Sequence, residues 1–244
     1  MEQTIGLSQR ALAPALALLA AHLLADFPLQ PRRWVEQKSP RGGRAPALPG
    51  PAAVAGVWGG LGALHGGAGG GAAAVALGHV LFDGLKARRR RDGLGAFLAD
   101  QGAHLVLLGI LALLIAGRGA RPIAPSAGLL GLINACLLTW WFEGALVGRA
   151  TARWRAELGT GGLDARGLPD AGLWIGRLER SLILVFVLIG RIEAVGFLIA
   201  AKSVFRFGEV TQPGQRREAE YILVGTMGSF LLALLTGLGA RALL

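Results

Sequence analysis

Long apolar runs, separated by short clusters of basic residues, constrain the fold of this chain more than any other feature. Hydrophobic residues make up 53% of the 244 residues and charged residues only 16%, against about 25% charged residues in soluble domains. A soluble protein of this length would need more charge to cover its surface, whereas a helix needs about 20 apolar residues to cross a membrane. The sequence therefore predicts an all-α, polytopic bundle of transmembrane helices.

The expected bundle has seven or eight hydrophobic segments in a single integral membrane domain that covers residues 1–244. The segments are expected at about 11–29, 52–66, 71–86, 94–116, 127–148, 173–190, 193–206 and 219–240. One alternative stays open near the C-terminus, because residues 173–206 could form one long helix instead of two segments. We favour a hairpin that turns near Gly190, since Arg191 and Glu193 would be costly at the centre of a single span.

The net charge of +10 comes from 25 Lys and Arg residues against 15 Asp and Glu residues. These basic residues flank the apolar segments, so the positive-inside rule explains them better than nucleic-acid binding, for which we find no recognition motif. With eight segments, the basic loops all lie on one side, which is then cytoplasmic. The first apolar run resembles a signal peptide only superficially. It carries His22 and Asp26 near its end, so we interpret it as a retained helix.

Three of the four histidines stand four residues from an aspartate in apolar segments, as the pairs His22 with Asp26, His79 with Asp83, and Asp100 with His104. Residues i and i+4 share one helix face, so an imidazole and a carboxylate can reach the same ion. All three pairs are expected at similar depth, near the cytoplasmic loops. The six side chains could form one crowded site or one open two-metal site for zinc, manganese or iron. The competing interpretation is that they form hydrogen bonds between helices.

Other polar residues in apolar segments have less specific interpretations. His65 is expected near the opposite membrane face, as a helix-end histidine. Lys202 and Arg206 form an i,i+4 basic pair that could bind an anionic group, or could simply snorkel to the membrane surface. The single cysteine, Cys136, cannot form an internal disulfide and is expected to be a small core residue.

Six stretches resemble a bacterial membrane-protein family catalogued as domain of unknown function 3307. They are HLLADFPLQ at 22–30, HVLFDGLK at 79–86, DQGAH at 100–104, GRLER at 176–180, GFLIAAKSVFRF at 196–207 and EYILVGTMGSF at 220–230. This resemblance implies a protein of the bacterial inner membrane but no activity. A weaker similarity links the His-x-x-x-Asp spacing to inner-membrane proteins described as metal-dependent hydrolases and to zinc transporters of the cation diffusion facilitator type.

The leading hypothesis is a membrane-embedded, metal-dependent hydrolase of a lipid or another phosphoester. Asp100 and His104 are its candidate catalytic residues, within the six-residue metal site. The alternatives are a divalent-cation transporter and a non-catalytic scaffold. A transporter needs a polar path to both faces, which here would have to come from Asn134, Thr139 or Glu143 on one segment. Membrane lipids are the expected partners, and self-association into a homo-oligomer stays open.

The charge pattern yields a direct test of topology. Reporter proteins fused after Arg44, Arg91 and Arg166 should all report a cytoplasmic location, because these residues lie in the basic loops. Paired alkaline phosphatase and fluorescent-protein fusions would measure this. A periplasmic signal at any one of the three positions would contradict the common depth of the His–Asp pairs.

Overall fold

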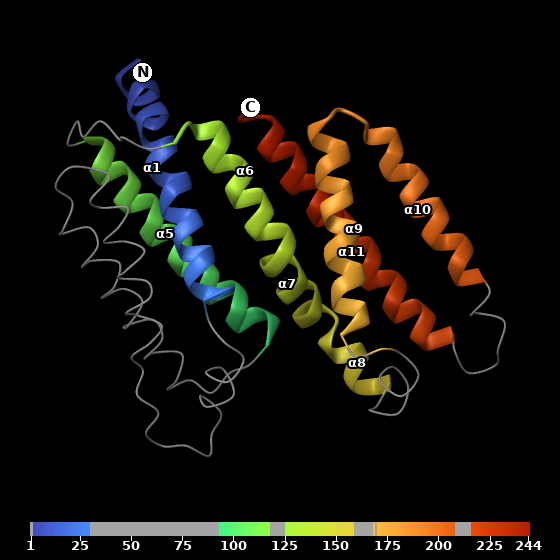
Figure 1. The fold of residues 1–244 in the computed structure, drawn as a ribbon. Coiled ribbons are helices and arrows are strands. Elements are labelled where there is room, and N and C mark those ends of the chain that lie inside the picture. Colours follow the sequence, from blue (N-terminus) through green and yellow to red (C-terminus); the bar gives the residue numbers. More distant parts are fainter. Residues whose placement is uncertain (1, 30–92, 118–124, 159–167, 169, 208–215) are drawn as a thin grey trace, which may run out of the picture. The chain divides into compact units, whose positions relative to one another are not determined.

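The computed structural model describes residues 2–29, 93–117, 125–158, 168, 170–207 and 216–244 (Figure 1). All regular structure in these residues is helical, which confirms the all-α fold class for this part of the chain. The predicted segments 52–66 and 71–86 lie outside it, as does His65. The chain divides into two compact units, Met1–Asn134 and Ala135–Leu244, which are described in turn.

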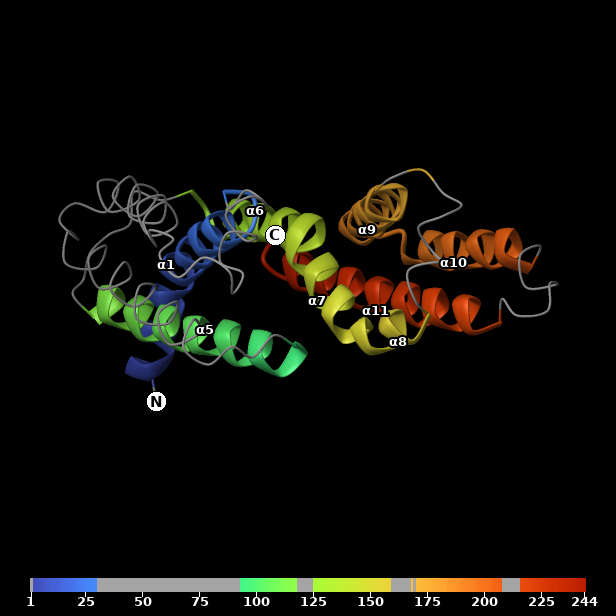
Figure 2. The same cartoon turned by 90° about the horizontal axis from the view of Figure 1, so that it is seen from below.

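The first unit is built on two antiparallel helices, α1 (Glu2–Asp26) and α5 (Leu94–Gly117), which lie side by side in Figures 1 and 2. Their contact is made largely by alanine and leucine, whose small or flexible side chains let the helix backbones approach closely. The buried residues are Ala11, Leu18, Ala21, Ala25, Leu108, Leu111, Ala112 and Ala116. Helix α5 covers the predicted segment 94–116, whereas α1 begins before the predicted segment 11–29 and ends within it, at Asp26.

Helix α6 (Ala127–Leu137) is connected to α1 by hydrogen bonding of Asn134. The Asn134 amide donates to the backbone oxygen of Leu16 at 2.8 Å, and to that of Leu130 at 2.9 Å. The helix then widens into a π-helical turn, η1 (Leu138–Phe142), and continues as α7 (Glu143–Ala150). The predicted segment 127–148 is therefore one interrupted helix.

The second unit begins within this helix, so that η1 and α7 belong to it, and it continues with α8 (Ala152–Leu158), α9 (Ala171–Leu188), α10 (Ile192–Phe207) and α11 (Arg216–Arg241). Ile183 and Val187 of α9 pack into its core against Val195, Phe230 and Ala233. The α9–α11 contact is close. A Cβ atom added to Gly237 would lie only 3.0 Å from the Cβ atom of Val187.

The chain turns sharply between α9 and α10, which confirms two helices where the sequence left one long helix open. Gly190 has a φ of +74°, a conformation that glycine adopts without steric cost. Arg191 and Glu193 are exposed at this turn. Their exposure agrees with the reason for predicting the hairpin, which was the cost of placing both charges at mid-span.

Three helices in the described residues are long and apolar enough to cross a membrane, namely Leu94–Gly117, Ala127–Ala150 and Arg216–Arg241. Large apolar side chains cover their outer faces, among them Leu105, Val106, Ile110, Leu113 and Leu114 on α5 and Leu223, Leu231 and Leu235 on α11. An apolar surface of this extent suits lipid and is unusual for a protein in water. The structure therefore supports membrane association.

The close α9–α11 contact predicts that adding a methyl group at Gly237 lowers the stability of the fold. Gly237→Ala should lower the free energy of unfolding by about 1–3 kcal/mol, because the added Cβ overlaps Val187 in a closely packed contact. Gly239→Ala is the matched control, since nothing lies within 4 Å of its added Cβ. Helical circular dichroism during denaturation in detergent would measure both. Equal stability of the Gly237→Ala and Gly239→Ala variants would contradict this packing.

Candidate functional site

Two of the three predicted His–Asp pairs face each other across the α1–α5 contact. His22 of α1 and His104 of α5 are 1% and 2% exposed, and their rings stack with centroids 4.7 Å apart at an angle of 21°. Gln101 of α5 is buried beside them. The side chains of Asp26 and Asp100 are 14% and 9% exposed, one helical turn from their histidines. The antiparallel packing therefore brings four predicted site residues into one buried polar group.

Gln101, which the sequence analysis did not single out, links His22 to Asp26. Its amide nitrogen donates to Asp26 Oδ2 at 3.4 Å, so its oxygen faces the Nε2 atom of His22 at 3.2 Å. A carboxylate and an amide oxygen are both acceptors, so His22 must carry a proton on Nε2 in this arrangement. The direct distance from His22 Nε2 to Asp26 Oδ2 is 3.9 Å, so the glutamine carries the connection.

His104 is held differently, by its own helix. Its Nδ1 atom lies 2.8 Å from the backbone oxygen of Asp100 and 3.9 Å from the Asp100 carboxylate. A carbonyl oxygen only accepts, so Nδ1 carries the proton and Nε2 is the basic nitrogen of the neutral ring. Metal-binding histidines commonly have this arrangement, in which a carbonyl fixes the tautomer of the ring.

The geometry of this group limits what it can bind. Two imidazolium rings stacked at this distance would repel each other, so the pair can hold one proton or one cation more easily than two charges. Within the described residues, no three His, Cys, Asp or Glu side chains converge in a way that could hold a metal ion. The third pair, His79 with Asp83, lies outside these residues, so a complete metal site would need its contribution.

The second unit contains a different buried polar group, made by Glu143 and Arg180. Their side chains are 2% and 5% exposed, with Arg180 Nε 3.7 Å from Glu143 Oε2. Thr236 of α11 donates its hydroxyl to Glu143 Oε1 at 2.8 Å. From the sequence, Glu143 was expected only as the lining of a transport path. Its contact with Arg180 could not be expected, because the two residues lie on helices far apart in the sequence.

Two further expectations concern Lys202 and Cys136. The Lys202 ammonium donates to Glu179 Oε2 at 2.6 Å, so its charge is already paired with a carboxylate. The side chain of Arg206 lies outside the part of the chain that the structure describes. The expectation for Cys136 was wrong, because this residue is exposed. It lies on the outer face of its helix, where an apolar residue can face lipid.

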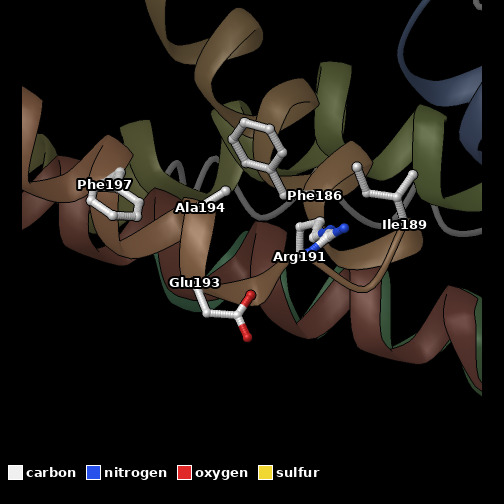
Figure 3. Close-up of a pocket in the computed structure, with 6 residues that line it drawn as sticks. All are labelled: Phe186, Ile189, Arg191, Glu193, Ala194 and Phe197. Carbon is white, nitrogen blue, oxygen red and sulfur yellow. The ribbon is translucent and has the colours of Figure 1, made fainter.

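An open hollow lies at the α9–α10 turn, lined by Phe186, Ile189, Arg191, Glu193, Ala194 and Phe197 (Figure 3). Its walls are mostly apolar. In Figure 3 the Glu193 carboxylate and the Arg191 guanidinium group lie apart, so the two charged groups do not converge on one point. The hollow therefore lacks the paired polar groups that make the α1–α5 cluster a candidate site.

The profile of a family described as "Protein of unknown function (DUF3307)" matches residues 15–121. This confirms the resemblance over that segment, which contains all six predicted metal ligands. The match does not extend to the three C-terminal stretches. No curated protein and no solved structure matches the chain significantly.

The bridging role of Gln101 can be tested by removing its amide. Gln101→Leu should destabilise the first unit by about 1–3 kcal/mol, because buried His22 and half-buried Asp26 each lose a hydrogen-bond partner. Gly102→Ala, the next residue along α5, meets nothing within 4 Å and should leave stability unchanged or raise it. Thermal unfolding in detergent distinguishes the two. A Gln101→Leu variant as stable as the unaltered protein would show that the bridge carries no stability.

Proposed function

We propose that this protein is a membrane-embedded, metal-dependent hydrolase. The family that matches its segment 15–121 has no assigned activity. The reaction class is hydrolysis of a lipid or another phosphoester. The observation that supports this best is the stacking of His22 on His104 at 4.7 Å, with Asp26 and Asp100 one turn away. Ionisable side chains inside a membrane are costly and usually serve a function.

In this proposal, the metal is zinc, manganese or iron, and its ligands come from His22, Asp26, His79, Asp83, Asp100 and His104. When bound, such a metal lowers the pKa of a water molecule and polarises the phosphoester. His104 would bind through Nε2, because the Asp100 carbonyl holds the proton on Nδ1. Gln101 fixes the orientation of His22 and Asp26. Asp100 and His104 are the proposed catalytic residues.

The runner-up is a divalent-cation transporter, which one observation favours. Glu143 is a buried acid on a helix that is long and apolar enough to cross a membrane, and it lies outside the His–Asp cluster. A transporter needs ionisable groups along a path, whereas a hydrolase needs them at one place only. A non-catalytic scaffold remains the third alternative, in which the His–Asp cluster only joins helices.

The setting of the site is part of the same proposal. We place the chain in a bacterial inner membrane with seven or eight spans and the His–Asp cluster toward the cytoplasm. Membrane lipids surround it, and the basic loops would contact anionic head groups. The paired Lys202 ammonium makes the Lys202–Arg206 pair a weaker anion site than its spacing indicated. Self-association into a homo-oligomer is compatible with this arrangement.

The decisive experiment measures bound metal and two activities on the same preparation. Purified protein should carry stoichiometric metal, and Asp100→Asn should weaken its binding about 10–100-fold, since it removes a charge near His104. The reconstituted protein should release phosphate or head group from a native lipid extract, and Asp100→Asn should abolish this release. Glu157→Gln removes an exposed acid of α8 and should change neither measurement.

The outcomes separate the three functions. Metal-dependent cation uptake into sealed vesicles, without hydrolysis, would establish the transporter instead of the enzyme. Folded protein that carries no metal and cannot be loaded with it would contradict both, and would leave the hydrogen-bonded scaffold.

A further inference from the structure

The Glu143–Arg180 group of the second unit is separate from the His–Asp cluster and lies outside the family match. Both residues are almost fully buried, although both can carry a full charge. They lie between helices α7, α9 and α11. Residues of this kind are rare inside apolar helix bundles, because an ion buried without a full set of partners is strongly disfavoured.

The guanidinium group of Arg180 lies between helices at a place where two glycines leave space for it. Its Nε atom donates to the backbone oxygen of Thr139, and its Nη1 atom donates to the Ser229 hydroxyl at 3.1 Å. A Cβ atom on Gly144 would lie 3.2 Å from Nη2, and one on Gly176 would lie 3.1 Å from Nη1. Two glycines therefore make room for the guanidinium group beside the π-helical turn.

The π-helical turn η1 supplies the acceptors for this contact. Thr139 and Trp140 both lie in it, and their backbone oxygens accept from Arg180 and, at 3.1 Å, from Arg177. Glu143 follows the turn directly, and its backbone N–H closes the wide turn by bonding to Leu138. Such turns are rare and occur frequently at functional sites. Here the turn joins the arginine-bearing face of α9 to the start of α7.

Glu143 is only half satisfied by this arrangement. Its Oε1 atom accepts from the Thr236 hydroxyl at 2.8 Å, and its Oε2 atom is 3.7 Å from Arg180 Nε. Among the residues that the structure describes, neither Glu143 Oε2 nor Arg180 Nη2 has a hydrogen-bond partner. The carboxylate of Glu143 and the guanidinium group of Arg180 are thus adjacent without a direct hydrogen bond. A change in the charge of either group can therefore increase the distance between them.

We propose that Glu143 is a proton-binding site within the second unit. The proton adds to Oε2, because Oε1 already accepts from Thr236, and the carboxylate becomes a neutral carboxyl group. Arg180 of α9 is the charged group that faces it, with Arg177 and Glu179 of the same helix acting on Arg180. From α11 the contacts are the hydroxyls of Thr236 and Ser229, which carry no charge.

Proton uptake at this position has a structural consequence. Neutral Glu143 no longer attracts Arg180, which then keeps a buried charge without a counter-charge. Arg180 can regain partners for its charge by moving away from the π-helical turn. Proton binding at Glu143 is therefore coupled to the packing of α7 against α9. Cys136 is an exposed residue of α6, three residues before Thr139 of the π-helical turn. A label on Cys136 can therefore report a movement of Arg180 away from this turn.

The test combines infrared spectroscopy with a label on the native cysteine. Full-length protein in lipid nanodiscs should show a carboxyl C=O band that rises as the pH falls. The part of this band that comes from Glu143 should be absent in Glu143→Gln, which mimics the protonated side chain. A fluorophore on Cys136 should change its emission over the same pH range, and this change should also be lost in Glu143→Gln. Glu193→Gln, which removes an exposed acid at the α9–α10 turn, should leave both signals intact.

A second variant keeps the test decisive should Glu143→Gln fail to fold. Thr236→Val removes the hydroxyl that donates to Oε1, and it should shift the frequency of the carboxyl band without removing it. A pH-dependent carboxyl band that is identical in the unaltered protein, Glu143→Gln and Thr236→Val would overturn the proposal. So would the absence of any such band. Neither result depends on whether the His–Asp cluster binds metal.

Discussion

Helices that pack in an apolar environment must satisfy their polar side chains against one another, because lipid offers no hydrogen bonds. This constraint determines which helix faces meet in both units. In the first unit, buried His22 and half-buried Asp26 lie where Gln101 and His104 face them. In the second unit, Arg180 can be buried only where Thr139, Ser229 and Glu143 surround it. Around these polar groups, contacts made by alanine, glycine and leucine allow the helix backbones to lie close together.

The two units meet this constraint with different chemistry. The first has two imidazole rings, an amide and two carboxyl side chains, which are groups that can bind a cation. The second has a buried acid and base, each with an atom that lacks a hydrogen-bond partner in the described residues. We therefore propose a metal site for the first set and a proton-binding site for the second.

The fold class and several helices followed from the sequence, because apolar length and charge placement are local properties. Segment 94–116 became α5, and the turn at Gly190 was predicted from the cost of two charges at mid-span. The i,i+4 spacing also indicated which face of α5 carries His104. Partners on other helices could not be predicted in this way. Gln101 has no periodic signal of its own, and LTWWF at η1 gives no indication of a π-helical turn.

The same reasoning explains the two residues whose surroundings differed from expectation. Lys202 looked available for an anion because Glu179 is distant in sequence, although the α9–α10 hairpin brings the two within 2.6 Å. Cys136 looked like a core residue because its segment is apolar on every side. In a helix that lipid can surround, an apolar residue need not face the core, so composition alone does not distinguish the two positions.

X-ray absorption spectroscopy of zinc-loaded protein tests the central claim most directly, because it identifies the ligands of a bound metal without assuming any activity. The proposed site predicts nitrogen and oxygen ligands at about 2.0–2.2 Å with the multiple scattering of imidazole rings, and a clear decrease of that scattering in His22→Ala with His104→Ala, which leaves His79 as the one proposed histidine ligand. Sulfur ligation through Cys136, an imidazole signal unchanged in that double variant, or a failure to retain zinc would contradict the claim that the α1–α5 cluster is a metal site.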